Sequence, residues 1–373
     1  MGQGWLALEL TNNAFLVGLV SAVGALPILL FSLPAGFVAD HTNKLRLVTA
    51  MQALLLIEAT TLWLLTLTHR VTIDWLLVLA AANGTFSAFE IPARQSMLVE
   101  LVGGERGDLH HAIALNSSGF NLARVVGPAI GATVIASAGV AWCFALNGVS
   151  YLAVLAGLFL IRLPRYAPPV STASPIAGML EGIRYMRGTP AVSAILRLMT
   201  AYAICGVPYL VLMPVVARDV LHEGARGYGL LLSCVGIGGL AGALFLAAAG
   251  KHIQRGRLLR LSAYAYAALL IAFALSRSLA LSCGLLLAVG CMMIVNMALA
   301  NGLLQLMVPD ALRGRLMAAY SFIVVGLAQV VGAFVAGAVA RAVSVDWAIG
   351  GAAAIMLVYA RYIFGRYPDV KRL

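Results

Sequence analysis

Apolar stretches of about 20 residues recur along nearly the whole chain and are separated by short polar breaks. As a helix, a stretch of this length crosses the roughly 30 Å of hydrocarbon in a bilayer. Backbone groups in lipid must form their hydrogen bonds within the segment, and no alternating pattern of about ten residues indicates a barrel. Only 10% of the residues are charged, whereas soluble domains average about 25%. The sequence therefore predicts an all-α polytopic membrane protein.

Eleven segments are long enough to span the membrane completely. Before them, residues 5–10 are apolar but too short to span, and the polar turn of residues 11–13 follows at once. We therefore expect a first helix that is truncated. The expected full spans lie near residues 14–38, 46–68, 74–93, 112–137, 140–162, 191–216, 227–249, 258–276, 279–305, 317–340 and 346–365.

Lys and Arg residues are distributed unequally between the two sides of these spans. If the break at residues 39–45 is cytoplasmic, alternation of the spans places eighteen of the 25 Lys and Arg residues inside and five outside. Cytoplasmic loops carry the excess of basic residues in multi-pass proteins. The sequence therefore predicts a cytoplasmic C-terminus. The excess of Lys and Arg in the cytoplasmic loops also explains the net charge of +11, so we expect no nucleic-acid binding.

The longest break between spans divides the chain into two parts. It contains adjacent prolines, a Ser/Thr cluster and an amphipathic stretch at residues 179–187. Short matches indicate a duplication: residues 21–24 resemble residues 233–236 at an offset of 212, and residues 125–127 resemble residues 330–332 at an offset of 205. Repeated halves are common in transporters. We expect an N-terminal half, a cytoplasmic linker and a C-terminal half at residues 1–162, 163–190 and 191–373.

Other classes of function find little support in the sequence. The five cysteines lie in apolar segments without paired or metal-like spacing, so we expect neither disulfides nor a metal site. No nucleotide-binding loop ending in Gly-Lys-Ser/Thr is present. The adjacent His110 and His111 lie beside a short charged loop and form no convergent catalytic group. We therefore expect no enzyme activity and no cofactor.

A motif lies between the second and third helices, counting the short first one. It reads Gly36-Phe-Val-Ala-Asp40 and continues with Asn43, Lys44 and Arg46. This pattern resembles the signature loop of the major facilitator superfamily, which implies two six-helix halves and a cytoplasmic gate. Gly36 would permit close helix approach, Asp40 would accept from a helix N-terminus or a basic side chain, and Asn43 would adopt the left-handed conformation usual for Gly. An ordinary basic cytoplasmic loop is the alternative.

The fifth helix carries a second motif, Arg124-Val-Val-Gly127-Pro128-Ala-Ile-Gly131. It resembles the Gly-Pro motif of antiporters in the same superfamily. Pro128 removes a helix hydrogen bond and favours a kink, while Gly127 and Gly131 would make a flat face for packing. The resemblance implies a bent helix interface that restricts leak and favours exchange. Generic packing by Gly and Pro is the alternative.

Three further stretches, residues 92–102, 112–124 and 305–315, resemble the branch that contains bacterial siderophore exporters and macrolide or multidrug efflux proteins. The last stretch supplies a cytoplasmic turn of the second half with Asp310, Arg313 and Arg315. The Arg that many drug/proton antiporters place in the middle of the fourth helix is absent, and residues 80–84 occupy that depth. The resemblance therefore indicates export without identifying the substrate or the coupling ion.

Charged residues within spans are functional candidates, because they cost free energy unless they face a cavity or a partner. Glu58 lies near the middle of the third helix and is the strongest candidate for binding and releasing a proton; a structural polar contact is the alternative. Glu90 and Arg124 are further candidates for proton coupling; alternatively, Glu90 would serve a gate or pair with Arg94 or the 40–46 loop. Arg124 would face the cavity or extend to the membrane surface, and Arg197 would extend to that surface.

These patterns predict a major facilitator-type fold of two six-helix halves with about eleven full membrane helices. We expect a monomeric secondary transporter of the bacterial inner membrane that exports a drug, macrolide or siderophore by proton antiport and alternating access. Its partners would be the small-molecule substrate, protons and the lipid bilayer. Facilitator-type uptake, a lipid-related carrier and an inactive truncated transporter are the alternatives, and the substrate-binding residues are unknown.

Overall fold

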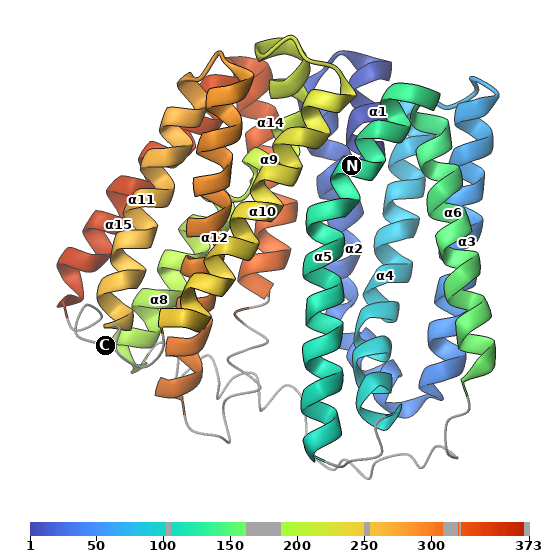
Figure 1. Cartoon of the computed structure of the whole chain (residues 1–373), viewed down its shortest axis with the longest axis horizontal. Helices are drawn as coiled ribbons and strands as arrows, with labels where there is room; N and C mark the ends of the chain where they lie inside the picture. The colour runs from blue at the N-terminus through green and yellow to red at the C-terminus, as the bar shows by residue number, and fades with distance from the viewer. Residues whose placement is uncertain (102–105, 162–187, 250–253, 309–319, 321, 369–373) are drawn as a thin grey trace. The chain divides into compact units, whose positions relative to one another are not determined.

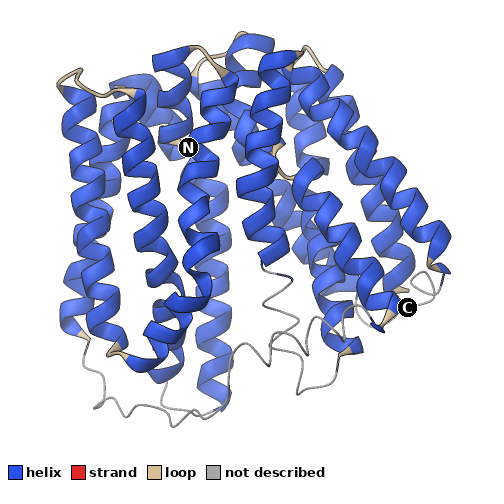
Figure 2. Ribbon diagram, turned by 180° about the vertical axis from the view of Figure 1, so that it is seen from behind, coloured by secondary structure: helices blue, strands red, loops and turns tan. Residues whose placement is uncertain are grey.

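The computed structural model describes residues 1–101, 106–161, 188–249, 254–308, 320 and 322–368; for some helical residues within these ranges it describes the backbone alone. The chain divides into two compact units, Met1–Ser171 and Thr172–Leu373. All regular secondary structure in the described ranges is helical (Figure 1, Figure 2). The predicted all-α class is therefore confirmed.

The first unit is built from helices that pack around α4 and α3. α2 packs along α4, while α3 packs against both α4 and α6, and the short α1 contacts α2, α4 and α6 (Figure 1). The described helices of this unit are α1 (Gly2–Thr11), α2 (Ala14–His41), α3 (Lys44–Leu67), α4 (Ile73–Leu101), α5 (Arg106–Ala138) and α6 (Val140–Leu160).

The second unit contains spans that are interrupted by π-helical turns. Pro208 and Pro214 interrupt the first of these spans, and Val207 N bonds to Tyr202 O in a π-type step there, because proline cannot donate to the regular helical ladder. The described elements are α8 (Pro190–Ala201), η1 (Tyr202–Gly206), α9 (Tyr209–Val215), η2 (Val216–Val220), α10 (Ala225–Ala249), α11 (Arg255–Leu275), α12 (Leu279–Met307), η4 (Phe322–Gly332), α14 (Ala333–Ala342), η5 (Trp347–Gly351) and α15 (Ala352–Arg366).

Nine segments of the described chain are helical, long and apolar enough to cross a membrane. Two shorter apolar helices, Val125–Ala138 and Ala328–Ala342, lie within two of the other expected spans. Large apolar side chains such as Phe159, Leu160 and Leu275 remain exposed on the helix surfaces, as lipid-facing residues do. The polytopic membrane fold is thus confirmed, while the count of eleven full spans stays a prediction.

α4 extends further than the sequence predicted. The membrane span that was expected to end near residue 93 ends at Met97, and the helix itself continues through Pro92 to Leu101. Two buried residues after the proline, Ala93 and Met97, explain why the helix continues. Their packing offsets the hydrogen bond that is lost at the proline. They form an apolar cluster with Ala39, Val48 and Leu158.

Each unit contains a helix crossing that only glycine permits. A Cβ atom at Gly84 of α4 would overlap the carbonyl oxygen of Gly24 on α2, and a Cβ atom at Gly290 of α12 would overlap the carbonyl oxygen of Val235 on α10. Without side chains, the backbones of the crossing helices lie in direct contact. The same crossing in both units agrees with a duplicated fold. The limits of the halves and of the linker stay predictions, because residues 162–187 lie outside the described part.

Candidate functional site

A buried carboxylate lies in the middle of α3. Glu58 is 5% exposed. Its Oε1 accepts a hydrogen bond from Nε2 of Gln3 at 3.1 Å, and its Oε2 accepts one from Nδ2 of Asn83 at 3.2 Å. Both donors are neutral amides, so among the described residues the carboxylate is stabilised by hydrogen bonds and not by a salt bridge. Such a group can gain or lose a proton without breaking an ion pair.

The packing of three helices brings these side chains together. α1 buries Trp5, Leu6 and Leu8 and thereby fixes Gln3 on the side facing α3. At its C-terminal end, Asn12 takes the left-handed conformation with φ 48° and bonds through its N–H to Leu8 O, an ending that satisfies a free carbonyl. Asn83 directly precedes the glycine of the α2–α4 crossing. Tight helix packing therefore positions both amide donors.

A second buried carboxylate lies further along the α3–α4 interface. Glu90 is 6% exposed, and Gln52 is 7% exposed. Oε1 of Glu90 accepts from Nε2 of Gln52 at 3.1 Å and from Nε of Arg94 at 2.7 Å. The side chain of Arg94 is 45% exposed, so the cluster connects the buried interface with the protein surface. The two carboxylates thus have different partners: amides alone for Glu58, an amide and a cation for Glu90.

Tyr151 of α6 connects the two carboxylates electrostatically. Its hydroxyl interacts with the charges of both Glu58 and Glu90, and it hydrogen-bonds the side chain of Asn147. α3 and α4 run antiparallel, so the pair of Glu58 with Asn83 and the pair of Glu90 with Gln52 lie at successive levels of one interface. Six residues of α3 separate these levels, which corresponds to about 9 Å. The first unit therefore contains a polar ladder, defined as Gln3, Glu58, Asn83, Tyr151, Gln52, Glu90 and Arg94.

The predicted gate loop is shorter than expected and has different local geometry. α2 ends at His41 and α3 begins at Lys44. Asn43 does not take the predicted left-handed conformation: its φ is −65°, and its side chain accepts from the N–H of Arg46 at 3.0 Å. The prediction was wrong because Asn is equally suited to cap a helix N-terminus. Asp40 lies in the last turn of α2, and its side chain is outside the described residues.

At two motif glycines, the described residues show no close helix approach, so the expected approach stays a prediction there. A Cβ atom at Gly36 or Gly127 would meet no described atom within 4 Å, whereas one at Gly131 would lie 3.3 Å from Sδ of Met1. Pro128 lies within α5, which continues through it. Only the backbone of Arg124 is described, so its role stays a prediction.

Some predicted residues cannot be placed in either cluster. Asp310, Arg313 and Arg315, the predicted cytoplasmic turn of the second half, lie outside the described residues. Arg197 lies on α8 and donates through Nη1 to the hydroxyl of Tyr367 at 3.1 Å.

The α11–α12 interface of the second unit holds a neutral polar cluster. Asn296 is fully buried, and its Nδ2 donates to Oγ of Ser262 at 3.2 Å and towards O of Leu259 at 3.5 Å. Oδ1 of Asn296 is buried without a hydrogen-bond partner among the described residues.

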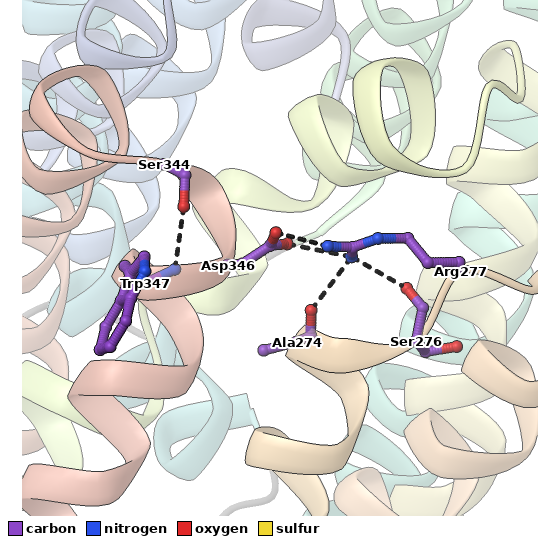
Figure 3. Close-up of polar contacts among 6 residues, drawn as sticks. All are labelled: Ala274, Ser276, Arg277, Ser344, Asp346 and Trp347. Carbon is purple, nitrogen blue, oxygen red and sulfur yellow. Dashed lines mark hydrogen bonds and ion pairs between the residues drawn. The ribbon is translucent and has the colours of Figure 1, made fainter.

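An exposed ion pair connects the end of α11 with the start of η5 in the second unit. Arg277, which follows α11, donates to both carboxylate oxygens of Asp346 at 3.1 and 2.6 Å (Figure 3). The same Nη1 atom lies 3.3 Å from the carbonyl oxygens of Ala274 and Ser276. This arrangement holds the end of α11 next to the start of η5.

Three members of the polar ladder were not among the candidates from sequence: Gln3, Gln52 and Tyr151. Gln3 and Glu58 are 55 positions apart, and Gln52 and Glu90 are 38 positions apart. No local pattern encodes such pairs. One signal was available, because a polar amide within an otherwise apolar membrane helix, such as Gln52, requires a partner.

Comparison with known proteins shows to which family the chain is similar. A family model described as Transmembrane secretion effector matches residues 1–371. Among curated proteins, the chain is 29% identical over 266 residues to the multidrug efflux pump Tap of Mycolicibacterium fortuitum, covering 67% of this chain and 63% of that protein. It is 26% identical over 270 residues to the staphyloferrin A transporter of Staphylococcus aureus, covering 71% and 66%. The match thus spans slightly less than two thirds of these relatives. It is also 26% identical over 315 residues to the enterobactin exporter EntS of Shigella flexneri, covering 84% and 71%.

Solved structures show the same fold. A bacterial homologue of the human lysosomal transporter Spinster, inward-facing and unoccupied, aligns with a TM-score of 0.71 at 14% identity and covers 100% of this chain and 93% of that one. A mutant of the nucleoside transporter NupG aligns with a TM-score of 0.75 at 12% identity, covering 99% and 94%. These neighbours are major facilitator transporters, so the predicted fold type is confirmed.

Proposed function

This chain belongs to the transmembrane secretion effector family of major facilitator transporters, and on that basis we propose that it exports a small molecule in exchange for protons. The relatives named for drug efflux and for siderophore transport or export support a substrate of the drug, macrolide or siderophore class. The exporter would act as a monomer in the bacterial inner membrane with its C-terminus in the cytoplasm, as the distribution of Lys and Arg favours.

The observation that carries the proposal is the setting of Glu58. An ionisable residue inside a membrane protein is costly and is a functional candidate by default. Glu58 is buried and has amide donors from both α1 and α4. In the charged form its two oxygens accept these hydrogen bonds, and in the neutral form the carboxylic acid removes the cost of a buried charge. The carboxyl group therefore suits proton binding in one conformation and release in the other.

Alternating access would couple this proton to the substrate. In transporters of this architecture, the two halves move against each other about a central site. We propose that protonation of Glu58 from the outer side permits the return to the inward-open state, and that substrate binding from the cytoplasm favours release of the proton. The gate residues Gly36, Asp40, Lys44 and Arg46 would control the cytoplasmic side.

Uphill export in an efflux-deficient bacterium tests the proposal. Cells that express the chain should accumulate less of at least one of three probes, a cationic dye, a macrolide and a catecholate siderophore, and an uncoupler should abolish the difference. Glu58→Gln should abolish uphill export, because the amide cannot carry a proton. Equal accumulation with the chain and with an empty vector, for all probes and regardless of the uncoupler, would refute export.

Glu9→Gln is the matched control. Glu9 lies on α1 in the same unit, but it is exposed and bonds only Nε1 of Trp5, a contact that Gln can also accept. The same chemical change at this position should leave export unchanged. If Glu58→Gln retains the uphill export and the pH dependence of the Glu9→Gln protein, Glu58 does not carry the proton.

A further inference from the structure

The contact between Gln52 and Glu90 leaves an acceptor without a donor. Gln52 donates through Nε2 to Oε1 of Glu90 at 3.1 Å. Its own Oε1 is buried and has no hydrogen-bond partner among the described residues. A buried acceptor without a partner is unfavourable, because it has lost its hydrogen bonds to water. The structure therefore shows a site in which one further hydrogen-bond donor would be stabilised.

The donors around Glu90 are arranged asymmetrically. The described donors, Nε2 of Gln52 and Nε of Arg94, both point to Oε1, so Oε2 is the oxygen that remains to accept a proton. A carboxylic acid and a primary amide form a cyclic pair in which each group donates once and accepts once. In this pair, the O–H of Glu90 would donate to Oε1 of Gln52 while Nε2 of Gln52 keeps its present bond.

We propose that Glu90, Gln52 and Arg94 form a second proton-binding site, in which Gln52 stabilises the protonated state of Glu90 and Arg94 stabilises the charged state. This proposal deepens the proton exchange proposed above and rests on it. Oε2 of Glu90 forms an O–H bond with a proton from a hydronium ion, whose own O–H bond breaks to leave water, and otherwise only hydrogen bonds change. The cluster changes from neutral to singly positive, since Arg94 keeps its charge.

The exposure of the three side chains indicates how a proton from water would reach the carboxyl group of Glu90. Glu90 and Gln52 are buried, whereas the Arg94 side chain is 45% exposed. Water that reaches the guanidinium is one hydrogen bond away from the carboxyl group of Glu90, which accepts from Arg94 Nε at 2.7 Å. Glu90 and Gln52 lie one level along the α3–α4 interface from Glu58 and Asn83. The second site therefore lies between the surface and Glu58.

In the second unit, the position equivalent to Glu90 is occupied by a residue that is not ionisable. Asn296 lies the same number of positions beyond Glu90 as Gly290 lies beyond Gly84, and Gly84 and Gly290 mark the equivalent crossings of the two units. Asn296 is fully buried and bonds Ser262 of α11. A neutral amide thus fills the equivalent place. Because the fold accommodates a neutral side chain there, the carboxyl group of Glu90 is not needed for packing alone.

Few other charges of the described residues lie near Glu90. α3 contributes Gln52 and also carries Lys44, Arg46 and Glu58, and α4 itself contributes Arg94. α2 packs on α4, but its titratable residues are His41, which is exposed, and Asp40. α1 carries Glu9, which is exposed and bonds Trp5. α6 contributes Tyr151. Among the described residues, Gln52 and Arg94 are thus the groups that bond Glu90 directly.

Infrared difference spectroscopy of the purified full chain in lipid, recorded over a pH titration, tests this site directly. Each carboxyl group that takes up a proton produces a carbonyl band of a carboxylic acid, which shifts in heavy water. Glu90→Gln should remove one band that Glu58→Gln leaves in place. Gln52→Met should retain this band and move it to higher frequency, because the acid loses its amide partner.

The outcomes separate this site from the export proposal. If the spectra of Glu90→Gln and the unmodified chain coincide, or if the Glu90 band is the same in Gln52→Met, the second site is refuted, even when Glu58→Gln abolishes export. If the Glu90 band is present and responds to Gln52→Met while no probe is exported, the site stands and the transport proposal fails. Glu90→Asn, which copies the amide found at Asn296, replaces Glu90→Gln if that variant does not fold.

Discussion

The crossing of α2 and α4 makes a prediction about stability that can be worked out from geometry. In Gly84→Ala, the added Cβ atom would lie 2.9 Å from the carbonyl carbon of Gly24 and 3.3 Å from Cδ of Pro27, and it would overlap the oxygen of Gly24. Carbon atoms pack best at about 3.5–4.0 Å, so the helices must separate by roughly 0.6 Å or more. Overpacking of this kind costs about 1–3 kcal/mol. Against this stands the gain of about 0.5–1 kcal/mol that alanine gives in a helix interior.

Thermal unfolding of the detergent-solubilised chain, followed by Trp fluorescence, measures the net effect of the overpacking and of the gain in helix propensity. We expect Gly84→Ala to lower the free energy of unfolding by about 1–2 kcal/mol and the midpoint temperature with it. The matched control is Gly157→Ala on α6, where an added Cβ atom meets nothing within 4 Å, so that only the helix propensity acts and the midpoint stays or rises. A midpoint for Gly84→Ala equal to that of the control would refute the argument that this crossing requires glycine.

Three further predictions concern single contacts. Asn43→Ala removes the side-chain cap of α3, which accepts from Arg46 N at 3.0 Å, and should lower the free energy of unfolding by about 1 kcal/mol; an unchanged midpoint would show that the cap contributes nothing. A double-mutant cycle with Arg277→Ala and Asp346→Ala should give a coupling of only about 0.2–1 kcal/mol, because both side chains are partly exposed, and a larger value would contradict this. Asn83→Leu removes a donor that favours the charged carboxylate of Glu58, so the pH profile of export should move to higher pH; a shift to lower pH would exclude this role.

The membrane fold could be predicted from sequence because its determinants are local. A helix that crosses hydrocarbon needs about 20 apolar residues in succession, and this pattern is visible without knowledge of contacts. The end of α4 could not be predicted in this way. Pro92 resembles a helix terminator, and only the packing of Ala93 and Met97 shows why the helix continues to Leu101. The geometry of Asn43 was open for another reason, since the same residue type caps helices and adopts left-handed turns.

The polar ladder was predictable in part. Glu58 and Glu90 stand out from sequence, because a carboxylate in an apolar helix is rare. Their amide partners come from other helices, and the positions of Gln3 and Gln52 relative to them depend on how α1, α3 and α4 pack. Sequence reasoning therefore found the groups that can titrate, and the structure identified the groups that would decide in which state they are stable.

The comparison of the two units indicates where the proton chemistry would lie. Both units have the same glycine crossing and a buried polar residue beyond it on the equivalent helix, Glu90 in one and Asn296 in the other. The helices α10, α11 and α12 contain no Asp or Glu, whereas α3 and α4 contribute Glu58 and Glu90. One ionisable residue at this crossing, in one of the two units, would be sufficient for a response to pH. The first unit would then respond to pH, while the second would supply the same packing without a change of charge.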